Sequence, residues 1–124
     1  MICRGIRGAT SADINAAVAI ITATRELLER IVAANDLLVE DVISVIFTAT
    51  PDLDAAYPAC AAREMGWMNT PLLCMQEMVV VGSLPRCIRV LVLWNTDLSP
   101  DLVQHVYLGR ARALRPDLLE EGET

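Results

Sequence analysis

Two apolar runs joined by a short turn form the clearest pattern of hydrophobic and polar positions in the chain. The runs cover residues 72–81 and 86–95, and both are rich in aliphatic and β-branched residues. The connection, residues 82–85, contains glycine and proline and is too short for a crossover helix. The pattern therefore predicts two buried strands that pair antiparallel with each other.

Apolar positions at strand and helix spacing predict the other elements. Residues 1–10 favour a strand bounded by glycines. A helix-start signal follows at Thr10 to Asp13, and apolar residues then keep a helical period to about Asn35. The remaining predictions are a strand at residues 41–50, a short helix from Pro58 to Met65 ended by Gly66, and a last strand at residues 105–113.

The order of these elements suits an α+β fold. Strand, long helix, strand, short helix and three further strands predict a mixed β-sheet packed by one long helix and short helices. The 124 residues are expected to form a single domain, residues 1–124, with a flexible C-terminal tail from about residue 115. Such a small sheet leaves its second face apolar and its edges open, so we expect the chain to oligomerise.

Composition narrows the functions that the chain can serve. Its 10 basic and 16 acidic residues give a net charge of −6, which argues against nucleic acid or an anionic membrane as a partner. All of the basic residues are arginine, so lysine-based Schiff-base chemistry is excluded. The single histidine, His105, offers no imidazole cluster for a metal and is expected to be structural.

The cysteines favour a reducing compartment. Cys3, Cys60, Cys74 and Cys87 are widely spaced and form no C-x-x-C pair, as expected of reduced thiols in a cytoplasmic protein. The longest uncharged apolar run of the predicted long helix, residues 14–24, is too short to span a bilayer.

Two charged residues stand inside the central apolar runs. Glu77 lies in the first run and Arg89 in the second, where burial penalises an unpaired charge. Their partner is either each other, as a structural ion pair, or a bound ligand. On these two residues alone, the two interpretations are even.

Six short strings, in order along nearly the whole chain, resemble one protein family. They are RGIRGAT at residues 4–10, TATPDL at 48–53, CMQEM at 74–78, CIRV at 87–90, HVYL at 105–108 and LRPDL at 114–118. The strings and their spacing resemble the small monofunctional chorismate mutases of the trimeric pseudo-α/β-barrel type. The resemblance implies that fold, a homotrimer, and active sites that lie between subunits.

The resemblance also implies a reaction, the conversion of chorismate to prephenate on the route to phenylalanine and tyrosine. This [3,3] sigmatropic rearrangement needs no nucleophile, metal or cofactor. The enzyme must restrict a dicarboxylate to its reactive conformer and stabilise charge as the ether bond breaks. A chain rich in arginine and poor in general bases suits that task.

Roles for individual residues follow from the resemblance. Arg89 would donate to the breaking ether oxygen and to a carboxylate, and Glu77 would accept from the ring hydroxyl with Cys74 nearby as a pocket-lining thiol. The other substrate contacts would be Arg7, Tyr57, Arg63, Leu73, Met75, Gln76, Tyr107, Leu114 and Arg115. The chain departs from the family at Cys60, where lysine is common, and at Tyr57, where phenylalanine is usual.

Strand geometry adds an expectation about how the site is shared. Side chains alternate along a strand, so Cys74 and Glu77 point to opposite faces unless a β-bulge lies between them. Both can then touch one ligand only if two neighbouring chains contribute them. Two other functions remain open: a non-catalytic trimeric module that binds a small carboxylate and, more distantly, a trimeric enamine or imine deaminase.

Overall fold

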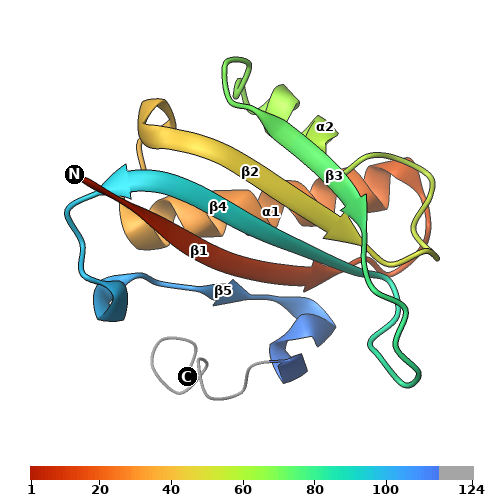
Figure 1. The fold of residues 1–124 in the computed structure, drawn as a ribbon. Coiled ribbons are helices and arrows are strands. Elements are labelled where there is room, and N and C mark those ends of the chain that lie inside the picture. The colour runs from red at the N-terminus through yellow and green to blue at the C-terminus, as the bar shows by residue number, and fades with distance from the viewer. Residues whose placement is uncertain (115–124) are drawn as a thin grey trace.

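The computed structural model describes residues 1–114, which form one mixed five-stranded sheet with both α-helices on the same face (Figure 1). The strands are β1 (Ile2–Ser11), β2 (Val42–Ala49), β3 (Leu72–Gln76), β4 (Cys87–Thr96) and β5 (Val106–Tyr107). The helices are α1 (Ala17–Asn35) and α2 (Ala59–Glu64), with short 3-10 helices η1 (Val39–Asp41), η2 (Pro100–Leu102) and η3 (Gly109–Leu114). The α+β fold class is confirmed, and the predicted tail lies outside the described residues.

The two central apolar runs are not neighbours in the sheet. The strand order is β3-β2-β4-β1-β5, and β2 lies between the runs, parallel to β3 and antiparallel to β4. The predicted pairing of residues 72–81 with 86–95 is therefore wrong, although β3 and β4 do run in opposite directions. Two strand spacings amount to about 10 Å, and residues 77–86 cross that gap.

The first run also leaves the sheet earlier than its composition suggests. β3 ends at Gln76, and the apolar residues from Met78 to Val81 are exposed. As an edge strand, β3 has a ladder partner only in β2, which itself ends at Ala49. The last bond between the two segments runs from the Glu77 N–H to the Ala49 carbonyl at 2.9 Å.

The long helix begins later than its start signal predicts. β1 continues through Ser11, and α1 starts only at Ala17. The intervening Asn15 makes a tertiary contact, because its side-chain oxygen accepts the backbone N–H of Asp54 at 3.0 Å. The predicted end of the helix near Asn35 is confirmed.

The last predicted strand is shorter than expected, and the remaining predictions hold. The chain turns into η3 at Gly109, with one residue between it and β5, and has a φ of 57° there that glycine adopts easily. A Cβ there would lie 2.8 Å from the Ser11 hydroxyl, so the position favours glycine for space as well. The strand predicted at residues 41–50 is confirmed as β2. The short helix before Gly66, which has a φ of 91°, is confirmed as α2.

The core lies between the sheet and α1. Ile6, Phe47 and Val92 from the sheet pack in one cluster with Leu27 and Ile31 from α1, and all of them are fully buried. Neither α-helix lies on the other side of the sheet in Figure 1, where Ala111 and Leu114 of η3 pack near β1 and β5. We call this side the open face; by strand register it carries Arg7, Ile46, Thr48, Leu73, Met75, Arg89 and Leu91. Within residues 1–114, no helix is both long and apolar enough to cross a membrane.

Candidate active site

An ion pair on the open face joins the two charged residues of the central apolar runs. Nε of Arg89 lies 3.1 Å from Oε2 of Glu77, and the two side chains are 46% and 22% exposed. The prediction that Arg89 is buried is therefore wrong for a single copy of the chain. Its strand alternates between the core and the open face, and position 89 points away from α1. The structural ion pair that the sequence left open is present.

The ion pair leaves hydrogen-bonding groups available for a ligand. Oε2 of Glu77 accepts from Arg89 and also from the Thr48 hydroxyl at 2.7 Å. Among the described residues, no side chain bonds to Oε1 of Glu77, so this oxygen keeps its lone pairs. Arg89 contacts the carboxylate through Nε, and its guanidinium also lies beside the Cys87 thiol. Most of its five N–H donors remain available.

A cavity of about 320 Å³ opens beside this ion pair, between β4 and the segment that follows β3. Its lining is Thr50, Glu77, Met78, Val80, Ser83, Leu84, Cys87 and Arg89. Burial raises the pKa of the Cys87 thiol, although the Arg89 charge acts in the opposite direction. Cys87 is therefore a neutral thiol near pH 7, and Glu77 and Arg89 supply the charge of this cavity.

Three more of the predicted residues lie on or beside the open face. Ala9 pairs with Arg89 on one side and with Tyr107 on the other, so these side chains project from the same face. Arg7, two residues earlier on β1, shares that face and is exposed. Tyr107 is buried in a small cluster with Ala9, and Leu114 packs against that cluster.

Cys74 lies on the opposite side of the sheet. It pairs with the fully buried Phe47 and packs against the core beneath the helices. The register between β2 and β3 is continuous from Leu72 to Gln76, so no β-bulge interrupts the alternation. The predicted separation of Cys74 from Glu77 across the sheet is confirmed.

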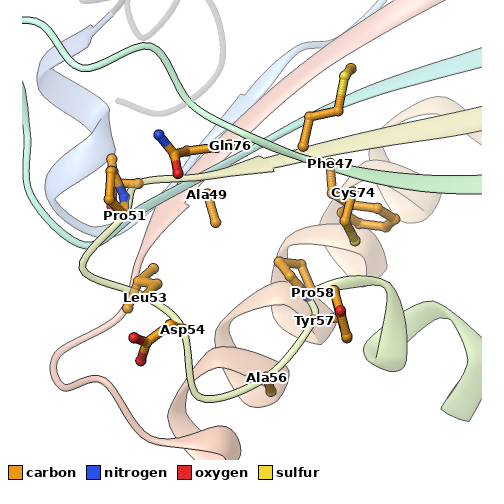
Figure 2. A pocket seen from close by; sticks show the side chains of 12 residues that line it. Phe47, Ala49, Pro51, Leu53, Asp54, Ala56, Tyr57, Pro58, Cys74 and Gln76 are labelled. Carbon is orange, nitrogen blue, oxygen red and sulfur yellow. The ribbon is translucent and has the colours of Figure 1, made fainter.

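A second cavity, of about 350 Å³, opens next to Cys74 on the helix side (Figure 2). It is lined by Phe47, Ala49, Thr50, Pro51, Leu53, Asp54, Ala56, Tyr57, Pro58, Cys74, Met75 and Gln76. In Figure 2 the loop that carries Leu53 and Tyr57 runs opposite the strands that carry Ala49 and Cys74. Tyr57 is 69% exposed, so it forms a wall that is open to solvent.

Helix α2 adds a charge to the helix side. Nη2 of Arg63 donates to the Cys60 sulfur at 3.4 Å. Burial raises the pKa of the Cys74 thiol, and the Arg63 charge acts in the opposite direction. Cys74 is thus a neutral thiol near pH 7, which agrees with a lining role and not with a nucleophile.

The predicted residues therefore fall into two groups within one chain. Leu73 and Met75 alternate onto the open face and are about half exposed, and Met75 also lines the helix-side cavity. Arg115 lies outside the described residues. We call Arg7, Glu77, Arg89 and Tyr107 the open-face half-site. We call Tyr57, Arg63, Cys74 and Gln76 the helix-side half-site.

Two residues stand out beside these groups. His105 has a structural contact, as predicted, because its Nδ1 accepts the Arg7 backbone N–H at 2.9 Å. Thr48 has a contact that sequence reasoning missed, since a threonine in an apolar strand gives no signal before its position opposite Arg89 is known. In the part of the chain that the structure describes, no group of three or more His, Cys, Asp or Glu side chains is arranged to hold a metal ion.

The structure is that of a small α+β protein whose open sheet face carries two arginines and one carboxylate acceptor, groups that commonly contact organic anions. The chain matches the family model of chorismate mutase type I over residues 3–118. It is 47% identical over 119 residues to chorismate mutase AroH of Bacillus subtilis (strain 168), covering 95% of this chain and 94% of that one. The corresponding enzyme of Thermus thermophilus is 53% identical over 116 residues, covering 93% and 95% of the two chains.

A solved structure agrees with these sequence matches. A chorismate mutase from Clostridium thermocellum superposes with a TM-score of 0.88 at 49% sequence identity, covering 89% of this chain and 98% of that one. The chain belongs to the chorismate mutase type I family. It is therefore an isomerase of aromatic amino acid biosynthesis, and the family resemblance of its six strings is confirmed.

Proposed function

We propose that this chorismate mutase converts chorismate to prephenate in the cytoplasm, by fixing the reactive conformer and stabilising charge on the breaking ether bond. No covalent intermediate, metal or cofactor takes part. The observation that carries the proposal is the Arg89–Glu77 ion pair beside a cavity, on a face that also presents Arg7. Two arginines suit a dicarboxylate, and a carboxylate with one free oxygen suits a ring hydroxyl.

Each residue of the open-face half-site has a distinct role in the proposal. Arg89 donates to the ether oxygen and to a substrate carboxylate, because its amino groups are not occupied by Glu77. Glu77 accepts the ring hydroxyl through Oε1. Arg7 and Tyr107 bind the side-chain carboxylate. Donors that are fixed before the reaction stabilise developing negative charge without reorganisation.

The helix-side half-site completes the cavity from a neighbouring chain. Tyr57, Cys74 and Gln76 line a concave and largely uncharged space that suits the ring and its substituents. They lie across the sheet from Glu77 and Arg89, so one ligand cannot easily contact both groups of the same chain. We therefore assign each active site to two copies of the chain.

The open face supports assembly into a homotrimer. Leu73 and Met75 are 54% and 47% exposed, and Leu91 is 36% exposed between them and Arg7. Monomeric proteins rarely expose contiguous apolar patches of this kind. Packing this face against other copies would remove the apolar surface from water.

Chorismate consumption tests the reaction. The purified chain should convert chorismate to prephenate, followed by ultraviolet absorbance, at a rate that a chelator does not change. A carboxylate-binding module would bind chorismate and leave it intact, and a deaminase would leave it unused. Activity that disappears with chelator and returns with a divalent ion would reject the proposed mechanism.

Mixed trimers test the shared site. Arg89→Ala removes the donor from the open-face half-site, and Cys74→Asp places a negative charge in the helix-side half-site. Each variant alone should be nearly inactive. Refolded together in equal amounts, random closed trimers should contain about a quarter of sites with both halves intact. If both variants form trimers and tagged chains demonstrate exchange, the absence of restored activity would exclude a shared site.

A further inference from the structure

The carboxylate of Glu77 is fixed by contacts with other side chains, because the residue lies just beyond the end of β3. β3 ends at Gln76, and beyond the single bond to the Ala49 carbonyl the chain leaves the ladder. The Glu77 carboxylate nevertheless has a defined place, since Oε2 accepts from the Thr48 hydroxyl at 2.7 Å and from Arg89 Nε at 3.1 Å. The position of this acceptor therefore depends on two donors from other strands.

Thr48 is the more rigid of these two donors. It lies in β2, which pairs with β3 on one side and β4 on the other, and its register partners are Met75 and Arg89. Threonine is branched at Cβ, so its χ1 is restricted in a strand. Arg89 has a long side chain that is 46% exposed, and a bound anion would compete for its donors.

We infer that Thr48 is a positioning residue for the reaction, which fixes Oε2 of Glu77 so that Oε1 faces the substrate hydroxyl. The inference rests on the proposed function, in which Glu77 accepts that hydroxyl. When substrate draws the Arg89 guanidinium toward its own oxygens, the Thr48 hydroxyl remains to hold the carboxylate. Thr48 acts through Glu77 and needs no contact with the substrate.

The alternative is that Thr48 serves only the sheet. A threonine in a strand with partners on both sides stabilises the ladder by its β-branched shape, whatever its hydroxyl does. Valine keeps this shape and removes the hydroxyl. Thr48→Val therefore separates the two roles, and Thr48→Ser makes the converse change by keeping the hydroxyl and removing the methyl group.

The test measures kcat/KM for chorismate in these variants. We expect Thr48→Val to lose about tenfold, near the lower end for a hydrogen bond to a charged group, and Thr48→Ser to stay within about threefold of the parent chain. In a Glu77→Ala background the valine substitution should change kcat/KM by less than about twofold, because the two residues act as one unit. A purely structural role would give the same loss in both backgrounds.

A matched control separates the site from the general effect of losing a hydroxyl. Thr96 lies at the far end of β4, where its Oγ1 accepts the Leu98 N–H at 3.2 Å. Thr96→Val should alter the thermal midpoint without lowering kcat/KM. If Thr48→Val does not fold, Thr48→Ser and Thr48→Ala differ by one hydroxyl, and their kcat/KM ratio gives the same comparison.

The outcomes distinguish this inference from the function on which it rests. A parent chain that leaves chorismate intact contradicts the proposed function. A parent chain that converts chorismate, together with Thr48→Val within twofold of it, overturns the positioning role alone. An equal loss from Thr48→Val with and without the Glu77 side chain overturns it as well.

Discussion

The face of the sheet beneath α1 and the open face are carried by the same strands, yet they differ in what covers them. On β4, Val90 and Val92 are buried against the helix, while Arg89 and Leu91, which alternate with them, remain exposed. The two glycines of β1 show the same contrast. A Cβ on Gly8 would meet the core atom Ile31 Cδ1 at 2.8 Å, whereas one on Gly5 would meet only leucine ends at 3.3 Å or more.

This contrast shows how one strand can serve stability and chemistry through alternate residues. Substitutions on the covered face should lower the free energy of unfolding, because that face is close-packed within one chain. Substitutions on the open face should alter activity more than the folding of a single chain. The predictions below test this division, in order of decreasing expected effect.

The largest effect is expected on the open face, from Arg89→Ala. Removing one preorganised donor to developing charge costs about 2.7 to 4 kcal/mol of barrier, equivalent to about a hundredfold to a thousandfold in kcat. Unfolding should change little, because Arg89 is half exposed and its pair with Glu77 is screened by solvent. Turnover of chorismate and the denaturant midpoint together measure the split.

Two further substitutions calibrate the Arg89 result. Arg89→Lys should recover only part of the activity, since a compact ammonium cannot contact an ether oxygen and a carboxylate as a planar guanidinium does. Arg25→Ala is the matched control, because Arg25 forms an exposed pair with Glu29 on α1 at 3.4 Å and lies outside the site. Turnover by Arg89→Ala equal to that of Arg25→Ala would remove Arg89 from the chemistry.

The second effect is expected on the covered face, from Gly8→Ala. The added methyl group would overlap Ile31 and also approach Val90 at 3.0 Å and Leu27 at 3.2 Å. Overpacking of this kind costs about 1 to 3 kcal/mol of unfolding free energy. Gly5→Ala is the matched control and should cost less, because Leu91 Cδ1 and Leu93 Cδ2 are flexible ends.

Chemical denaturation at a fixed chain concentration measures both glycine variants. Equal midpoints for Gly8→Ala and Gly5→Ala would mean that the two faces respond alike, and the division between them would fail. A Gly8→Ala variant that folds with the parent midpoint would show that α1 shifts to admit the methyl group.

The sequence predicts where the strands lie along the chain better than it predicts their order in the sheet. Alternation and turn residues locate β1, β2 and β4 to within a residue or two, because these signals are local. The pairing of residues 72–81 with 86–95 is wrong because strand order depends on long-range contacts, here the insertion of β2 between them. The start of α1 is misplaced for a similar reason, since Asn15 bonds to Asp54 in a distant loop.

The contacts within the candidate site also depend on strand order, which the sequence does not predict. The two charges in apolar runs predict that Glu77 and Arg89 pair either with each other or with a ligand, and they do meet, but beside Thr48 of the strand between them. Thr48 is uncharged and β-branched, so it is an ordinary residue in an apolar strand. The sequence around it therefore gives no sign of a functional contact. Arg89 is predicted to be buried because most residues of its run are apolar. The run nevertheless has one covered and one exposed face, and Arg89 lies on the exposed face.

The smallest effect is expected where β2 ends and β4 begins, at Asp52. Its Oδ2 accepts the backbone N–H of Arg86 at 3.0 Å, and its Oδ1 accepts the Thr50 hydroxyl. Arg86 has a φ of 48°, a conformation that is uncommon for a non-glycine residue, so this bond holds a strained turn just before Cys87. Burial of Asp52 opposes ionisation, but the Thr50 hydroxyl, the Arg86 N–H and the Arg86 charge outweigh it and lower the pKa of Asp52 below its ordinary value of 3.8.

A lowered folded-state pKa gives Asp52 a defined dependence on pH. The stabilising contribution is fully present above the ordinary value of 3.8 and is lost as the pH falls through the lower folded-state pKa. Asp52→Asn keeps an acceptor and removes the charge, so it should lower the free energy of unfolding by about 0.5 kcal/mol or less at pH 7, because solvent screens this exposed group. The gap between the two proteins should close as the pH is lowered through the acid range, while kcat/KM at pH 7 stays within about twofold, since Asp52 lies outside both half-sites. Denaturation curves at several pH values measure the gap, and a gap that widens toward low pH would mean that the carboxylate destabilises this turn.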